Sequence, residues 1–118
     1  MDITKKKEPH TIPQQKYLHL ILGWFGVEIG MSLEQVKVDI YKRICNRELF
    51  EREHVNKRGK RVTYLRSTND LTKDEYSLSI TRFRNYASVE AEIYLPSSDE
   101  RQFLSYIEGE MERYKEFI

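Results

Sequence analysis

Apolar residues recur at helical spacing in four separate stretches of the chain. The first stretch, 12–29, carries two apolar stripes that together leave little of its circumference polar. A helix that is apolar nearly all round is buried, so this stretch predicts a central helix or one that also meets another subunit. The stripes consist of Leu18, Ile21, Leu22, Phe25 and Ile29 on one side and Tyr17, Leu20, Trp24 and Val27 on the other.

Each of the four stretches opens with a capping box. In this motif a Ser or Thr and a Glu or Gln three residues later satisfy each other's free backbone N–H group. Helices are therefore expected at about 12–29, at 33–45, from residue 72 onward and at about 98–117. The four boxes pair Thr11 with Gln14, Ser32 with Gln35, Thr72 with Glu75 and Ser97 with Glu100.

The second, third and fourth helices are amphipathic, and each has one apolar stripe that we expect to be buried. The fourth also carries an acidic face with Glu108, Glu110, Glu112 and Glu116. The expected buried stripes are Leu33, Val36, Ile40 and Ile44, then Tyr76, Ile80, Phe83 and Ala87 with Tyr86 beside them, and finally Leu104, Ile107, Met111 and Tyr114.

A different pattern lies between the second and third helices. Phe50, Val55, Val62 and Tyr64 flank a turn at Asn56–Gly59, which is typical of a hairpin that pairs about 49–55 with 60–66. A two-stranded ribbon is marginal in water, so it must pack on the helices or on a partner. The expected fold is mostly α (α+β), with about four helices and one small antiparallel β-hairpin, in a single domain 11–118 after a basic tail 1–10.

Composition supports one soluble domain, because 118 residues with 39% hydrophobic and 33% charged side chains suit a modest core. No apolar stretch approaches the roughly 18 residues needed to span a membrane, and no apolar segment of a secretory signal follows the basic N-terminus. The single cysteine, Cys45, cannot form an internal disulfide. These features predict a cytoplasmic protein without membrane contact.

Positive charge is concentrated in the middle of the chain although the net charge is only +1. Residues 37–66 contain ten cations and four acids, and four of the cations surround the expected turn. A ribbon with cations at its tip can contact a phosphate backbone, and aromatic rings such as Tyr41, Phe50 and Tyr64 can stack on unpaired bases. Lys37, Lys42 and Arg43 can extend the track; the alternative is a solvated turn with these rings in the core.

No motif for nucleotide binding, acyl transfer or zinc binding is present. His54 and Asp70 can be imagined as a nuclease centre, but a metal nuclease needs several converging carboxylates, and the spacing provides no such cluster. We therefore expect a protein that is not an enzyme and that uses no metal and no cofactor.

Three motifs occur in a fixed order: TIPQQKYLHLILG at the first helix, Lys37 in EQVKVDI, and the corner LRSTNDLTKDEY. Over roughly 11–95 they resemble the phage NinB family, also called Orf recombination proteins. The chain departs from the family at Gln15, His19 and Val36, where the family has Asn, Trp and Trp. The matching residues are Gln14, Lys16, Leu18, Leu22, Gly23, Lys37, Arg66, Ser67, Thr68, Leu71, Glu75, Ile80, Phe83 and Tyr86.

This resemblance implies a dimeric, non-catalytic DNA-binding accessory of phage or mobile-element homologous recombination. Such a protein favours single-stranded or single-strand-containing DNA and helps to load the recombinase past single-strand-binding protein, which is then a second partner. Ser67 and Thr68 are expected to form a structural corner between ribbon and helix. The pattern and the resemblance together predict that DNA is bound by Lys57, Arg58, Lys60, Arg61, Arg66, Lys16, Lys37, Arg82 and Arg84.

Two further hypotheses remain open. The chain can be a small protein–protein interaction module that uses its acidic C-terminal helix or its hairpin, or a small structure-selective nuclease. Salt dependence separates phosphate binding from protein binding, because each neutralised phosphate releases counterions.

Overall fold

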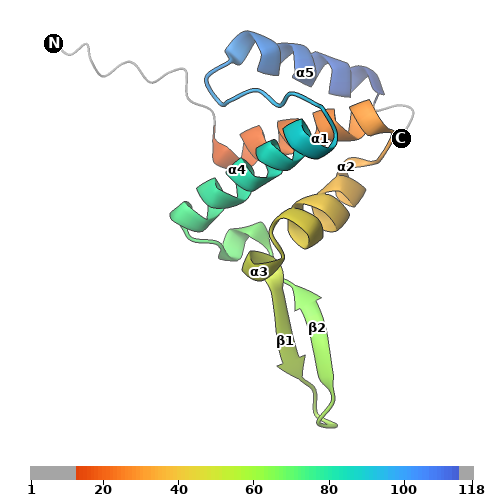
Figure 1. Ribbon diagram of the computed structural model, residues 1–118, viewed down its shortest axis with the longest axis vertical. Helices are drawn as coiled ribbons and strands as arrows, with labels where there is room; N and C mark the ends of the chain where they lie inside the picture. Colours follow the sequence, from red (N-terminus) through yellow and green to blue (C-terminus); the bar gives the residue numbers. More distant parts are fainter. Residues whose placement is uncertain (1–12, 115–118) are drawn as a thin grey trace, which may run out of the picture.

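A computed structural model describes residues 13–114, in which a β-ribbon projects from a body of helices (Figure 1). The expected mostly α fold with one antiparallel hairpin is confirmed. None of the helices in these residues is long and apolar enough to cross a membrane. The elements are α1 (Gln14–Ile29), α2 (Leu33–Gln35), the π-helix η2 (Val36–Cys45), α3 (Arg47–Phe50), β1 (Glu51–Val55), β2 (Arg61–Leu65), the 3₁₀-helix η3 (Thr68–Asp70), α4 (Lys73–Glu90) and α5 (Arg101–Tyr114).

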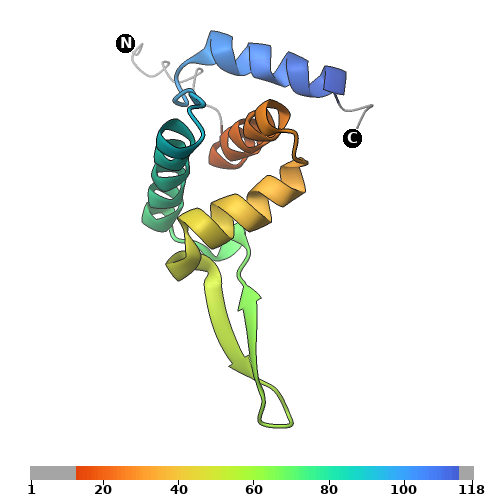
Figure 2. The same ribbon diagram turned by 45° about the vertical axis from the view of Figure 1, so that its right-hand side comes forward.

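Helix α1 is the centre of the body, and most of its apolar residues are buried by this same chain (Figures 1 and 2), but Ile29 is 39% exposed, so the prediction that Ile29 is buried is wrong. Phe25 packs against Phe83 of α4, with ring centroids 5.3 Å apart. On the opposite side the Trp24 ring meets Phe103 and Tyr106 of α5 edge-on. Part of α1 stays open, because Val27 and Leu20 line a pocket with Met111 of α5.

The second helix differs from the expectation because most of it is a π-helix. Its backbone hydrogen bonds join residues five apart instead of four, so the residues that face the core follow a different spacing from that of an α-helix. Val36, Ile40 and Tyr41 are buried, whereas Ile44 is 57% exposed, so the prediction that Ile44 is buried is wrong. Cys45 takes the half-buried place one residue later, as expected for a small residue near a helix end.

Capping boxes begin two of the predicted helices as expected. Gln35 N donates to Ser32 Oγ at 3.2 Å, and Glu75 N donates to Thr72 Oγ1 at 3.1 Å, with both reciprocal bonds present. At α5 the Glu100 carboxylate accepts from Ser97 N at 3.1 Å, but the helix starts at Arg101, later than expected. Helix α1 also starts later, at Gln14, after an N-cap at Pro13. The proposed cap Thr11 and the basic tail 1–10 lie outside the described residues.

The hairpin is shorter than predicted at both ends. Leu49 and Phe50 belong to the short helix α3 and are buried, because Phe50 packs its ring on Tyr41 with a centroid distance of 5.4 Å. The strands are therefore 51–55 and 61–65, and they form a sheet of two strands only. After β2 the Ser67 hydroxyl accepts from Asn69 N at 3.0 Å. This bond confirms that Ser67 and Thr68 form a structural corner.

Candidate nucleic-acid interface

The ribbon carries its acidic side chains on one face only. In an antiparallel pair, directly opposed residues point to the same face. The register places Glu51, Glu53 and Val55 opposite Leu65, Thr63 and Arg61. The other face carries two pairs, Arg52 with Tyr64 and His54 with Val62. We call this second face the acid-free face, because it contains no carboxylate.

A five-residue loop, 56–60, closes the ribbon and fixes this register. Asn56 N donates to Lys60 O at 2.9 Å, and Gly59 N donates to Asn56 O at 2.9 Å. Gly59 has a φ of +80°, which an L side chain rarely adopts. The Asn56 side-chain oxygen also accepts from the backbone N–H groups of Arg58 and Lys60, at 2.9 and 3.0 Å. The loop is thus held by its own backbone and by Asn56.

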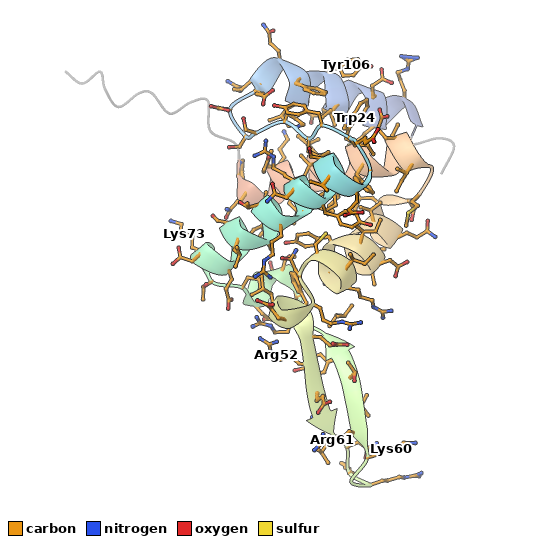
Figure 3. The ribbon with its side chains drawn as sticks, viewed as in Figure 1. Trp24, Arg52, Lys60, Arg61, Lys73 and Tyr106 are labelled. Carbon is orange, nitrogen blue, oxygen red and sulfur yellow. The ribbon has the colours of Figure 1, made fainter. Side chains whose placement is uncertain are left out.

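The tip cations Lys57, Arg58 and Lys60 are all exposed at the far end of the ribbon. Their side chains form no hydrogen bond or ion pair with any other residue in 13–114. Figure 3 shows Lys60 and Arg61 at the end of the ribbon, well away from the helices. Three unpaired cations on one projecting loop raise the positive potential there, which attracts anions.

Arg61 is less available than the three tip cations. It lies at the start of β2 on the acidic face, and its Nη1 is 3.3 Å from Glu53 Oε1. Both side chains are exposed, so this pair contributes little to stability. The carboxylate nevertheless offsets part of the positive potential on that face.

Arg66 is placed at the ribbon base and is used inside the protein. Its Nε and Nη2 donate to the Leu49 carbonyl oxygen at 3.0 and 2.7 Å, and Nη2 lies 3.8 Å from Glu75 Oε1. Lys42 also stabilises the base of the ribbon, because its Nζ donates to Arg66 O at 2.9 Å and lies over the Phe50 ring. Burial lowers the pKa of Lys42, and Lys37 adds to this effect. Arg66 and Lys42 therefore anchor the ribbon to the body.

Three other predicted cations are engaged on the helical body, away from the tip. Lys16 of α1 lies 3.5 Å from Glu108 of α5. Arg82 donates to Glu48 at 2.9 Å, and Arg84 donates through Nε and Nη2 to the Leu95 carbonyl. The structure thus does not bring these side chains together with the tip cations.

Lys37 lies in a small polar pocket on the body. The pocket has a volume of about 260 Å³ and is lined in part by Gln15, His19, Ser67 and Asn69. Gln15 bridges its two sides by donating to Asn69 Oδ1 at 3.0 Å. The pocket joins all three of the segments that carry the resemblance, but it does not contain the tip cations.

Of the three rings that were considered for base stacking, only one is accessible. Tyr41 and Phe50 are fully buried, and the Tyr41 hydroxyl lies 2.7 Å from Ser79 Oγ. Tyr64 is 48% exposed on the acid-free face of the ribbon. Tyr41 and Phe50 are therefore core residues, as the alternative of a solvated turn had predicted for such rings.

Two residues on the acid-free face of the ribbon were missed from the sequence. Arg52 and His54 share the acid-free face with Tyr64 and Val62. Arg52 is held at the ribbon base by donating from Nη1 to the carbonyls of Glu48 and Glu51, at 3.1 and 2.9 Å (Figure 3). Only the strand register reveals this grouping, because both residues alternate with glutamates along β1.

Within residues 13–114, no group of three or more His, Cys, Asp and Glu side chains is placed to hold a metal ion. The comparisons with protein families, with curated proteins and with solved structures gave no significant match.

Proposed function

We propose that this protein binds DNA that is single-stranded or contains single-stranded segments, and that it acts without catalysis as an accessory of phage or mobile-element recombination. The observation that supports DNA binding is the set of three unpaired cations, Lys57, Arg58 and Lys60, on a ribbon that projects from the body. A projecting loop of this kind can contact phosphates without a clash between the helices and the nucleic acid.

The recombination role rests on the family resemblance of the motifs in 11–95. In this proposal the protein works as a homodimer in the bacterial cytoplasm and contacts single-strand-binding protein as well as DNA. Sedimentation of the protein alone and with single-strand-binding protein tests these two contacts.

DNA binding is tested by fluorescence anisotropy of a labelled single-stranded oligonucleotide, titrated at several salt concentrations. The expected affinity falls with salt, with a log–log slope of about −0.7 for each neutralised phosphate. Absence of binding at low salt by folded protein would mean that the cations only solvate a turn. Incubation of branched and single-stranded DNA with Mg²⁺ or Mn²⁺ should leave the strands intact, and nicking would replace the non-catalytic proposal with a nuclease.

A further inference from the structure

Tyr64 is an exposed aromatic residue whose ring packs against no other ring in the described part of the chain. Three aromatic rings in 13–114 are prominently exposed, Tyr64, Tyr94 and Tyr106. Tyr94 stacks on Phe103, and Tyr106 packs edge-on against Trp24 at 5.7 Å. Tyr64 has no ring contact and no hydrogen bond with the described residues. About half of its side chain, 48%, is therefore open to a partner.

The surroundings of Tyr64 suit an anionic partner with flat, apolar groups. Arg52 lies directly opposite on β1, and Val62, two residues nearer the tip, is 42% exposed on the same face. The nearest glutamates of the ribbon, Glu51 and Glu53, point to the other face. A polyanion that lies along the acid-free face thus meets cations and apolar surface without meeting a ribbon carboxylate.

The acid-free face also continues to the tip cations. Tyr64 and Lys60 are four residues apart, which is about 14 Å at strand spacing. A short segment of nucleic acid can therefore contact Tyr64 through a base and Lys60 through a phosphate at the same time. A duplex keeps its base faces inside the stack, so Tyr64 can stack only on an unpaired base.

We propose that the acid-free face is the surface that binds single strands, and that Tyr64 is the residue that recognises unpaired bases by stacking. The inference rests on the proposed function and deepens it, because it assigns selectivity for single strands to one side chain. Arg52 and the tip cations supply phosphate contacts, which carry no preference for unpaired bases.

The test compares two labelled strands of equal length and charge, an oligothymidine and an oligonucleotide whose sites are abasic. The parent protein should bind the base-containing strand more tightly. Tyr64→Thr should reduce that preference by roughly 5- to 150-fold, which is the range for loss of one stacked base. Tyr64→Phe should retain it, because the phenylalanine ring stacks as well. The salt slope of all three proteins should agree, which shows that the ribbon remains folded.

An exchange variant provides the matched control. It combines Thr63→Tyr with Tyr64→Thr and so moves the ring to the acidic face, opposite Glu53, with no change of composition or charge. We expect this variant to lose the preference for bases as Tyr64→Thr does. Retention of the preference would show that the face does not matter and would overturn the assignment of the acid-free face.

The other outcomes are also decisive. If Tyr64→Thr keeps the parent's preference, or if Tyr64→Phe loses as much as Tyr64→Thr, Tyr64 does not act by stacking, and DNA binding through the tip stands without it. If the parent binds neither strand at low salt, the proposed function itself fails.

Discussion

The Arg66 guanidinium donates two hydrogen bonds to the carbonyl oxygen of Leu49, through Nε at 3.0 Å and Nη2 at 2.7 Å. Leu49 belongs to α3, which directly precedes β1, and Arg66 directly follows β2. The contact therefore closes the base of the ribbon. The backbone continues this closure, because Arg66 N donates to Phe50 O at 2.8 Å. Arg66 is thus a structural residue at the point where the ribbon leaves the body.

Replacement of Arg66 should weaken the fold more than it weakens phosphate binding. Arg66→Ala removes both bonds to Leu49 O and the ion pair with Glu75, so we expect the free energy of unfolding to fall by about 1–3 kcal/mol. Urea unfolding measures this change. Arg58→Ala is the control, because an exposed tip side chain should change stability by less than about 0.5 kcal/mol. Equal stability of the two variants would contradict the structural role of Arg66.

Removal of the tip cations should weaken DNA binding and flatten its salt dependence. The triple variant Lys57→Ala, Arg58→Ala and Lys60→Ala loses three charges that have no partner in the described chain. If each contacts one phosphate, the log–log salt slope becomes shallower by about 2. Anisotropy titrations at several salt concentrations measure the slope.

The matched control removes the same charge from the body. Lys73→Ala, Arg101→Ala and Arg113→Ala are exposed substitutions on α4 and α5 and also remove three charges. Figure 3 shows Lys73 on the body, away from the ribbon tip. This variant should keep the parent's slope and most of its affinity. If both triple variants lose the same affinity, net charge binds the DNA and the ribbon tip is not the site.

Gly26 should tolerate no side chain. A Cβ at this position would lie 2.4 Å from the backbone oxygen of Met31, which cannot move without a shift of the turn after α1. This turn is tied to α1, because Gly30 N and Met31 N both donate to Gly26 O. We expect Gly26→Ala to lower the free energy of unfolding by about 1–3 kcal/mol in urea denaturation.

Gly23 is the matched comparison in the same helix. A Cβ there would meet the end of the Met111 side chain, with Cε at 2.3 Å. A flexible methionine can turn away, and alanine favours a helix over glycine by about 1 kcal/mol. Gly23→Ala should therefore cost less than Gly26→Ala, and the reverse order would show that the Met31 carbonyl yields easily.

Alkaline pH should destabilise the fold. Burial raises the pKa of the Cys45 thiol from 9.0 to about 12. Between these values the folded chain keeps a proton that the unfolded chain has released, so the free energy of unfolding falls as pH rises. Burial also raises the pKa of Tyr17, Tyr41 and Tyr76. Their ionisation in the unfolded chain therefore lowers the free energy of unfolding further as pH rises. Urea unfolding at neutral pH and at about pH 10 measures it.

Cys45→Ala separates the thiol from the tyrosines. In this variant the decrease in stability that begins near pH 9 should shrink, whereas the part that follows tyrosine ionisation should remain. The same burial predicts slow reaction of Cys45 with thiol reagents in the folded protein and fast reaction in urea, because the thiolate is the nucleophile. Equal reaction rates in both states would contradict this environment for Cys45.

Local sequence determined most of the helical body. Periodic apolar residues and capping boxes act over three or four neighbours, so the helices after Ser32 and Thr72 begin as expected and Tyr76, Ile80 and Phe83 are buried. The π-helical turns were not predictable, because the 3.6-residue period assumes bonds to the fourth residue. Ile44 is exposed for that reason.

The tertiary structure alone decided which cations are free. Arg84 meets the Leu95 carbonyl, Arg82 meets Glu48, and Lys16 meets Glu108, so each partner comes from a distant part of the chain. Spacing along the sequence cannot show such contacts. The tip cations are free because a projecting loop has no neighbouring element to supply a carbonyl or a carboxylate.

The register of the ribbon also depends on the tertiary structure, although the hairpin itself is predictable. The sequence by itself determined that a hairpin turns near Gly59 and carries cations at its tip. End-to-end pairing of the predicted strands would have placed Tyr64 opposite Glu51, whereas the structure places it opposite Arg52. A shift of one residue moves every side chain to the other face of a strand. The loop 56–60 and the packing of Phe50 fix the register of the two strands. Only the folded chain therefore decides that Tyr64 lies on a face without acids.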